Sequence, residues 1–304
     1  MTTKPKPWYG RDTQLTVRMG FTLFLLAVLY TAFLALLWRS TGSAMLLVLA
    51  GVALLLLQYF AADKLVLLST GARMIGDQDE PVLHRIIERL AQLADLPTPR
   101  LALMETAAPN AFATGRSPKH AVVAVTRGLI AVLEPAELEG VLAHEISHIK
   151  NRDMMVLTYA SLLASVAAFI VQIGMWTGFG MGGRRGRGGG SVAAIFLGSA
   201  VVWIVSFFLL RALSRYREYS ADRGSVLLTG SPATLRSALL KVSGPGGRIP
   251  IKDLRTAQTM SAFFIVPTTT KRGKRGELFA THPTLAHRLA RLEAMEQGMN
   301  AAAR

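Results

Sequence analysis

Residues 140–148 read Gly-Val-Leu-Ala-His-Glu-Ile-Ser-His and join an apolar turn to two histidines four positions apart. On a helix of 3.6 residues per turn, His144 and His148 lie on one face, with Glu145 beside them. Two imidazoles in this spacing can bind Zn²⁺, and the carboxylate can act as general base toward water. Because a buried His-Glu-His cluster would be costly without a metal, the apolar residues before it favour a metal site over a solvated helix face.

A third ligand is expected further along the chain, where residues 217–222 read Arg-Glu-Tyr-Ser-Ala-Asp. Glu218 can complete a site of two histidines and one carboxylate, leaving one position for water or substrate. Asp222 lies four residues later on the same helix face and can accept a hydrogen bond from a ligand imidazole. The alternative is a surface helix with salt bridges. The sequence contains no cysteine, so a zinc site must use histidines and carboxylates.

Apolar blocks surround these motifs. The chain is 51% hydrophobic and only 17% charged, with mean hydropathy +0.36. Four uncharged blocks, each long enough to cross a bilayer as a helix, cover Met19–Trp38, Ser43–Ala62, Met154–Gly183 and Gly188–Leu210. We therefore predict a mostly α-helical membrane protein with transmembrane helices. The expected parts are an N-terminal hairpin (1–62), a first catalytic part with the zinc helix (63–153), a second hydrophobic hairpin (154–210) and a second catalytic part (211–304).

The segment between the second and third blocks has the mixed pattern of an α+β domain. Apolar residues at helical spacing predict a helix over Pro81–Ala94, and Leu101–Glu105 and Ala121–Thr126 read as short strands. Thr126 is expected to cap a helix that runs through Leu133. The sequence thus predicts a small β-sheet beside the zinc helix.

The basic residues beside the apolar blocks indicate how the chain is oriented in the membrane. The net charge is +15, and four basic residues precede the first block, whereas only Arg39 follows it. By the positive-inside rule, the N-terminus and the 63–153 domain should be cytoplasmic. Arg184, Arg185 and Arg187 break the pattern, which leaves open whether the last two blocks fully cross. Since aromatic and basic residues do not interleave and no nucleic-acid motif occurs, we expect lipid and not nucleic acid as the partner of the basic residues.

Several motifs together resemble the HtpX family of membrane zinc metalloproteases over nearly the whole chain. They are Pro109–Gly115, Val125–Leu129, the 144–148 motif with Asn151 and Asp153, Arg217–Asp222, and Thr281-His282-Pro283 followed by Arg288. Thr284 and His287 depart from the family pattern, which weakens roles inferred for this tail.

The resemblance implies a zincin-like fold with one zinc ion held by His144, His148 and Glu218, and Glu145 as the catalytic carboxylate. It implies that Asn110, Ala111 and Phe112 form an edge strand that pairs with substrate backbone, and that His282 lies near the site and helps to hold an oxyanion. It further implies a multi-pass protein of the bacterial inner membrane that degrades membrane-protein or unfolded substrates under stress. Oligomeric state is left open.

Two alternatives remain at this point. A CAAX-type prenyl-protein protease shares the zinc helix but usually has more membrane spans. A zinc-bound membrane adaptor without activity would not require Glu145, which is intact here.

Overall fold

The computed structural model describes residues 13–41, 53, 56, 57, 59–61, 64–176, 189–244 and 282–302. Most of the predicted second apolar block lies outside the described residues. The arginine-rich linker at 184–187 also lies outside them.

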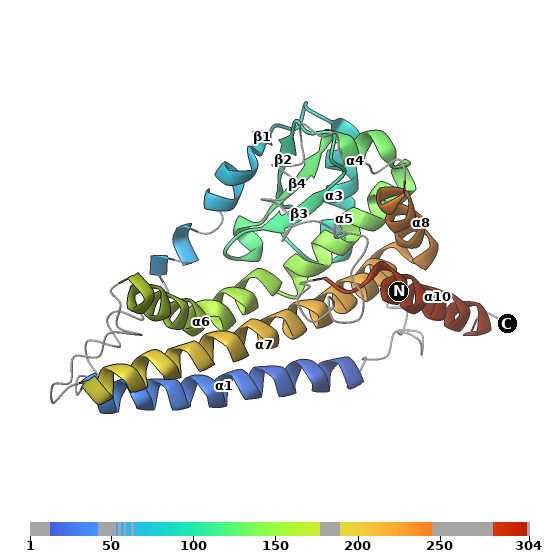
Figure 1. Cartoon of the computed structure of the whole chain (residues 1–304). Helices are drawn as coiled ribbons and strands as arrows, with labels where there is room; N and C mark the ends of the chain where they lie inside the picture. The colour runs from blue at the N-terminus through green and yellow to red at the C-terminus, as the bar shows by residue number, and fades with distance from the viewer. Residues whose placement is uncertain are drawn as a thin grey trace.

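A four-stranded mixed sheet forms the centre of the upper domain in Figure 1. Its strands are β1 (Arg73–Ile75), β2 (Arg100–Met104), β3 (Ala111–Thr114) and β4 (Val122–Thr126), in the order β1-β2-β4-β3. Only the β2–β4 pair is parallel. β4 is buried along its whole length because it lies between two strands and under helices, whereas β3 lies at one edge of the sheet.

Helices cover one face of the sheet. They are α3 (Pro81–Leu93), α4 (Arg127–Val132) and α5 (Pro135–Lys150). Ile86, Ile87 and Leu90 are buried against the same core as α5, together with Leu83. Val82 and Leu93, which have the same helical spacing in the sequence, are exposed. The hydroxyl of Thr126 accepts a hydrogen bond from the Leu129 amide and caps α4, as the sequence predicts. These contacts fix α5, which carries the two histidines, above the sheet.

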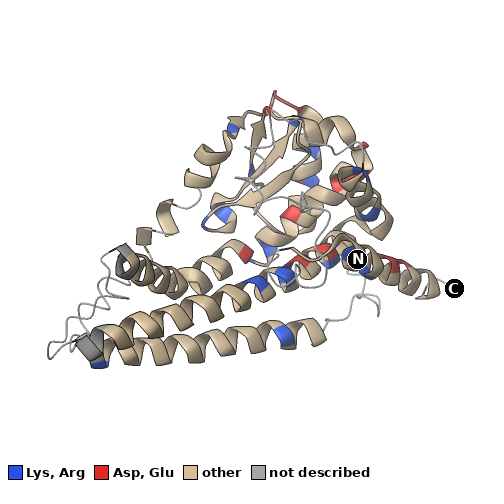
Figure 2. Cartoon of the chain, viewed as in Figure 1, with Lys and Arg blue, Asp and Glu red and all other residues tan. Residues whose placement is uncertain are grey.

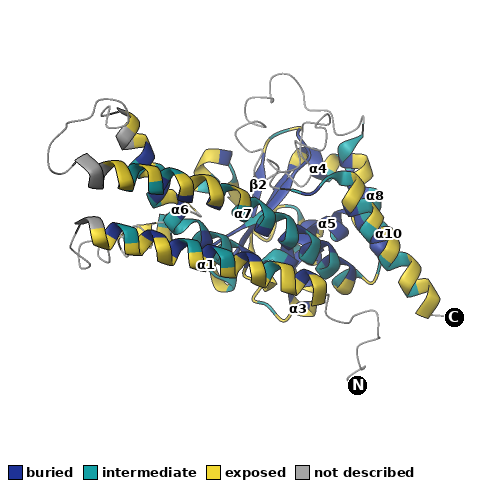
Figure 3. Ribbon diagram, turned by 60° about the horizontal axis from the view of Figure 1, so that its bottom comes forward, coloured by how far each residue is buried: buried dark blue, intermediate teal, exposed yellow. Residues whose placement is uncertain are grey.

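Three helices are long and apolar enough to cross a membrane within the part of the chain that the structure describes. They are α1 (Thr13–Thr41), α6 (Asp153–Trp176) and α7 (Gly189–Thr229), and they pack along one another. Their apolar lengths carry few charged side chains (Figure 2) and many exposed residues (Figure 3). Exposed apolar side chains such as Phe24, Phe169 and Val201 are the surface that a lipid bilayer would cover. The chain is therefore a membrane protein, as its composition predicts.

The predicted hairpin helices differ in their continuity. α7 runs unbroken from the apolar block through Glu218 and Asp222. The zinc helix does not continue into the third block, because α5 ends at Lys150 and α6 begins at Asp153. At the junction Arg152 adopts a left-handed conformation, with φ of 55°. The chain turns there, so Asp153 is placed back beside the last turn of α5.

α5 and α7 approach each other closely at the level of these motifs. A Cβ added at Gly224 would lie 2.3 Å from the hydroxyl oxygen of Ser147, so only glycine leaves room for α5 there. The next residue on α7 is Ser225, and its hydroxyl donates to the carbonyl of Gly140 on α5 over 2.7 Å. α8 (Pro232–Ser243) and α10 (Leu285–Ala302) then pack beside this pair. The close contact places the Glu218 turn of α7 opposite the histidine face of α5.

Candidate metal centre

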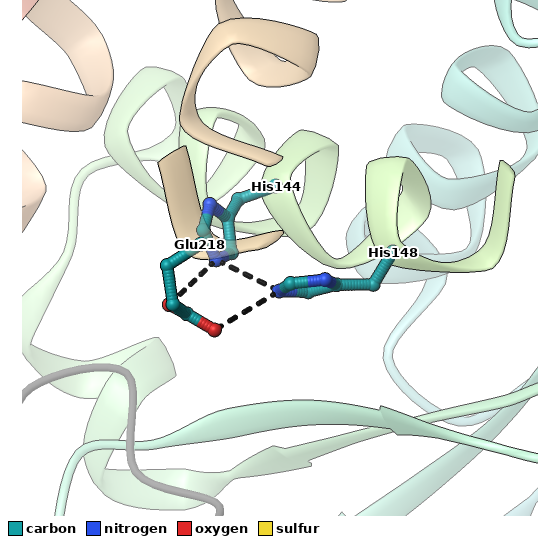
Figure 4. Close-up of side chains that lie close together, drawn as sticks. All are labelled: His144, His148 and Glu218. Carbon is teal, nitrogen blue, oxygen red and sulfur yellow. Dashed lines mark hydrogen bonds and ion pairs between the residues drawn. The ribbon is translucent and has the colours of Figure 1, made fainter. Parts of the chain in front are cut away.

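Three predicted ligands converge between α5 and α7 (Figure 4). The Nε2 atoms of His144 and His148 lie 3.2 Å apart. Glu218 Oε2 lies 3.5 Å from His144 Nε2, and Glu218 Oε1 lies 3.5 Å from His148 Nε2. His144 and Glu218 are buried, and His148 is 13% exposed. The site is therefore shielded from bulk water but reachable from one side.

These distances fit a divalent cation. Ligand atoms about 2.1 Å from a tetrahedral ion lie roughly 3.4 Å from one another. The spacing of the two nitrogens and the carboxylate matches that value. Two imidazoles and one carboxylate are a common donor set for zinc, with a fourth position left for water or substrate.

His144 is oriented by a buried carboxylate, which in turn is held by an arginine from α10. Asp222 Oδ1 lies 3.0 Å from His144 Nδ1. Arg288 donates to both Asp222 oxygens, over 3.0 Å from Nε and 2.5 Å from Nη2. Burial lowers the pKa of His144, but hydrogen bonds to Asp222 and Glu218 outweigh it and raise the pKa overall. With its proton held at Nδ1, the imidazole directs the lone pair of Nε2 at the shared centre.

His148 has a similar arrangement that the sequence reading did not assign. Its Nδ1 lies 2.6 Å from Asp153 Oδ2, and Asp153 Oδ1 lies 2.9 Å from Nε of the buried Arg217. The turn at Arg152 brings Asp153 to this position. These two residues could have been found from their positions in the sequence, because Asp153 follows His148 by five residues and Arg217 directly precedes Glu218.

Replacing Asp153 should therefore weaken metal binding while leaving the three direct ligands in place. We expect Asp153→Asn to lower metal affinity by about 10- to 100-fold, because the imidazole loses its orienting carboxylate. Competition with a chelating dye, in detergent, measures this. Asp77→Asn is the matched control, because the Asp77 side chain is 97% exposed in the loop before α3. Equal affinities for both variants would contradict the assigned contact.

Glu145 lies beside the ligands and faces the edge strand. Its Oε2 accepts a hydrogen bond from the Ala113 amide over 2.9 Å. Burial raises the pKa of Glu145, although the neighbouring histidines and the Ala113 hydrogen bond oppose this. A carboxylate with a raised pKa is suited to take up a proton and pass it on near neutral pH.

The outer edge of β3, which no described strand pairs with, faces the same space. The Asn110 carbonyl accepts from the Thr126 amide, so the peptide groups of Asn110, Phe112 and Thr114 point toward β4. Because the N–H and C=O groups of successive residues point to opposite edges of a strand, those of Ala111 and Ala113 point away from β4. On this side the Ala113 amide meets Glu145. An extended peptide could add to this edge through backbone hydrogen bonds.

A cavity of about 260 Å³ joins the three ligands, Glu145 and the edge strand. Ala111, Phe112 and Ala113 line it, together with Tyr59 from the end of the second apolar block. Asn110 is fully buried and is not among the lining residues. Its backbone N–H donates to the Thr126 hydroxyl over 2.8 Å, which fixes the start of β3. The structure thus places Ala111 and Phe112 at the cavity and Asn110 behind it.

His282 also lines the cavity, and its Nδ1 lies 3.1 Å from Glu218 Oε2. The side chain therefore contacts a predicted metal ligand directly. Its role in holding an oxyanion stays a prediction.

Comparison with known proteins agrees with this geometry. A family model described as Peptidase family M48 matches residues 77–296. The chain is 53% identical over 291 residues to a protein named Protease HtpX homolog of Moorella thermoacetica, covering 95% of this chain and 97% of that one. It is 48% identical over 285 residues to Protease HtpX homolog 1 of Streptomyces coelicolor, covering 93% of each.

A solved structure shares the fold. The crystal structure of S. mikatae Ste24p matches with a TM-score of 0.54 and 19% identity, covering 92% of this chain and 67% of that chain. The two chains therefore share their fold over most of this chain.

Proposed function

Because the chain belongs to peptidase family M48, and is thus a membrane metalloprotease, we propose that it is a zinc-dependent endopeptidase that cleaves cytoplasmic segments of membrane proteins. The observation that carries this proposal is the convergence of His144, His148 and Glu218 beside Glu145 and the outer edge of β3. The ligand set supports zinc as the metal.

Substrate binding would begin at the strand edge. The peptide groups of Ala111 and the carbonyl of Ala113 would pair with an extended segment and hold it across the cavity, while the Ala113 amide stays bonded to Glu145. Such pairing reads backbone and not side chains, so it suits a protease with many substrates. Phe112 and Tyr59 would contact the substrate from the walls of the cavity.

Proton transfer would fall to Glu145. When bound, the cation supplies Lewis-acid polarisation of the water and of the scissile carbonyl. Glu145 would take the proton of the attacking water and deliver it to the leaving amine. His282 would stabilise negative charge that develops on the carbonyl oxygen, for which its position beside Glu218 is suitable. Asp222 and Asp153 would keep the two imidazoles aligned throughout.

The position of the site supports membrane-bound substrates. Glu218 lies on α7 eight residues beyond the end of the apolar block, or about 12 Å along the helix. A substrate anchored in the same bilayer would have a raised effective concentration at this height. The excess of basic residues before α1 favours a cytoplasmic catalytic domain in a bacterial inner membrane, and this placement suits degradation of damaged membrane proteins under stress.

Metal removal tests the proposal directly. We expect purified protein treated with a chelator to stop degrading an unfolded substrate such as casein, and to stop cutting itself. Added zinc should restore both activities. Full activity after verified removal of the metal would overturn the proposal. A prenylated peptide cut in preference to casein would favour a prenyl-protein protease instead.

A further inference from the structure

A second groove lies between α6 and α7, next to the catalytic cavity. Its volume is about 300 Å³, and its lining residues are Leu157, Thr158, Ser161, Leu210, Arg211 and Ser214. Three of these residues also line the catalytic cavity, namely Leu157, Thr158 and Ser214. The groove and the cavity therefore adjoin, and a peptide that leaves the cavity on this side enters the groove.

The groove lies where the apolar surface of α7 ends. Exposed apolar side chains continue along this helix as far as Phe208, and Arg211 is the first charged residue after them. The corresponding part of α6, around Thr158 and Ser161, is only partly buried. The groove thus leads from the catalytic cavity toward the membrane surface, where a membrane-anchored substrate would continue.

Arg211 is the one charged residue among those that line the groove in the described part of the chain. Its Nη1 donates to the Phe207 carbonyl over 3.3 Å, and its guanidinium lies 3.3 Å from the centre of the Phe207 ring. The groove hydroxyls of Thr158 and Ser161 donate to carbonyls of their own helix, so their oxygens remain as acceptors. The guanidinium of Arg211, in the partly buried wall of the groove, is suited to bind a carboxylate, because it can donate two hydrogen bonds to one.

The geometry points to Arg211 as a specificity-determining residue that binds an acidic side chain of the substrate, about three residues from the scissile bond. This inference rests on the proposed peptidase function. Arg211 and Glu218 are seven residues apart on α7, or about 10 Å along a helix. An extended peptide covers about 3.3 Å per residue, so about three residues span that distance.

Peptides with blocked ends test this assignment. One set carries Asp, Asn or Lys at the third residue before the cut, and another carries the same residues at the third position after it. Each is assayed for kcat/KM with the full-length, zinc-loaded protein in detergent. We expect the Asp peptide to exceed the Asn peptide about tenfold on one flank, the effect of one charged hydrogen bond.

Variants of α7 assign the preference to one side chain. Arg211→Gln should bring the Asp-to-Asn ratio to about one, and Arg211→Glu should favour the Lys peptide, a gain that misfolding cannot produce. Arg215→Gln is the matched control, because Arg215 lies one turn away on α7 and is not among the described residues that line either cavity. Its ratio should stay that of the wild type.

Three results would overturn the inference. The first is equal cleavage of Asp and Asn peptides by the wild type on both flanks. The second is an Asp-to-Asn ratio of kcat/KM that is unchanged in Arg211→Gln. The third is a ratio that is lost in Arg215→Gln as fully as in Arg211→Gln. A requirement for anionic lipid that disappears in Arg211→Gln, with no peptide preference, would assign the guanidinium to a lipid phosphate instead. Failure of the wild type to cut any peptide would count against the proposed function itself.

Discussion

Glu145→Gln should retain the bound metal and lose almost all proteolysis. Glutamine has the same shape and can still accept the hydrogen bond from the Ala113 amide, so the site keeps its structure. It cannot take a proton from water, and proton transfer of this kind contributes about 10²- to 10⁴-fold to the rate. We therefore expect kcat to fall by a factor in that range while the zinc content stays that of the wild type.

The matched control for this variant lies on the same helix. Glu139 also belongs to α5, but its carboxylate pairs with Arg89 at the surface. Glu139→Gln should keep both metal and activity. Metal analysis and casein degradation on the same preparations decide the outcome. If Glu145→Gln degraded casein as fast as the wild type, another group would have to be the base.

His144→Ala should lose the metal itself. The imidazole supplies one of three converging ligand atoms, and its removal also leaves the carboxylate of Asp222 without its histidine partner. The loss of affinity should exceed the roughly 10- to 100-fold expected for an orienting residue such as Asp153. Activity should vanish together with zinc, in contrast to Glu145→Gln, where only activity is lost.

A histidine outside the site serves as the control. His120 is exposed in the short 3₁₀ helix before β4, where its ring lies 2.8 Å from the Ser117 hydroxyl. His120→Ala should bind zinc and cleave casein normally. If His144→Ala kept full zinc content after dialysis, the ligand assignment would fail.

The two histidines of the candidate metal centre could be brought together from sequence because their spacing is local. His144 and His148 share a helix face whatever surrounds them, and Glu218 follows from the need for a carboxylate on a second helix. The zinc helix and the membrane helix α6 are separated by a turn at Arg152, whose backbone is left-handed. No glycine marks this turn, and the available signals of a helix end were Asn151 at the C-cap and Lys150 in the last turn.

Other parts of the site depend on contacts between distant segments. The contact between Asp222 and Arg288 joins residues 66 positions apart in sequence. The periodicity of apolar residues in the sequence does not predict such a contact. Asn110 was expected at the substrate, yet it is buried at the start of β3, and this burial depends on the register with β4, which the sequence of β3 alone does not fix. The apolar composition, in contrast, predicts the membrane helices directly, because twenty uncharged residues have few other stable environments.

The contact between Arg288 and Asp222 has a consequence for biosynthesis. The ribosome makes His144 long before it makes Arg288, and only the later helix brings the guanidinium that balances the buried aspartate. A nascent chain that still lacks α10 would hold an incompletely neutralised carboxylate behind its first histidine. The candidate metal centre therefore reaches its full set of contacts only after translation has passed residue 288. Until then the nascent chain lacks a complete active site.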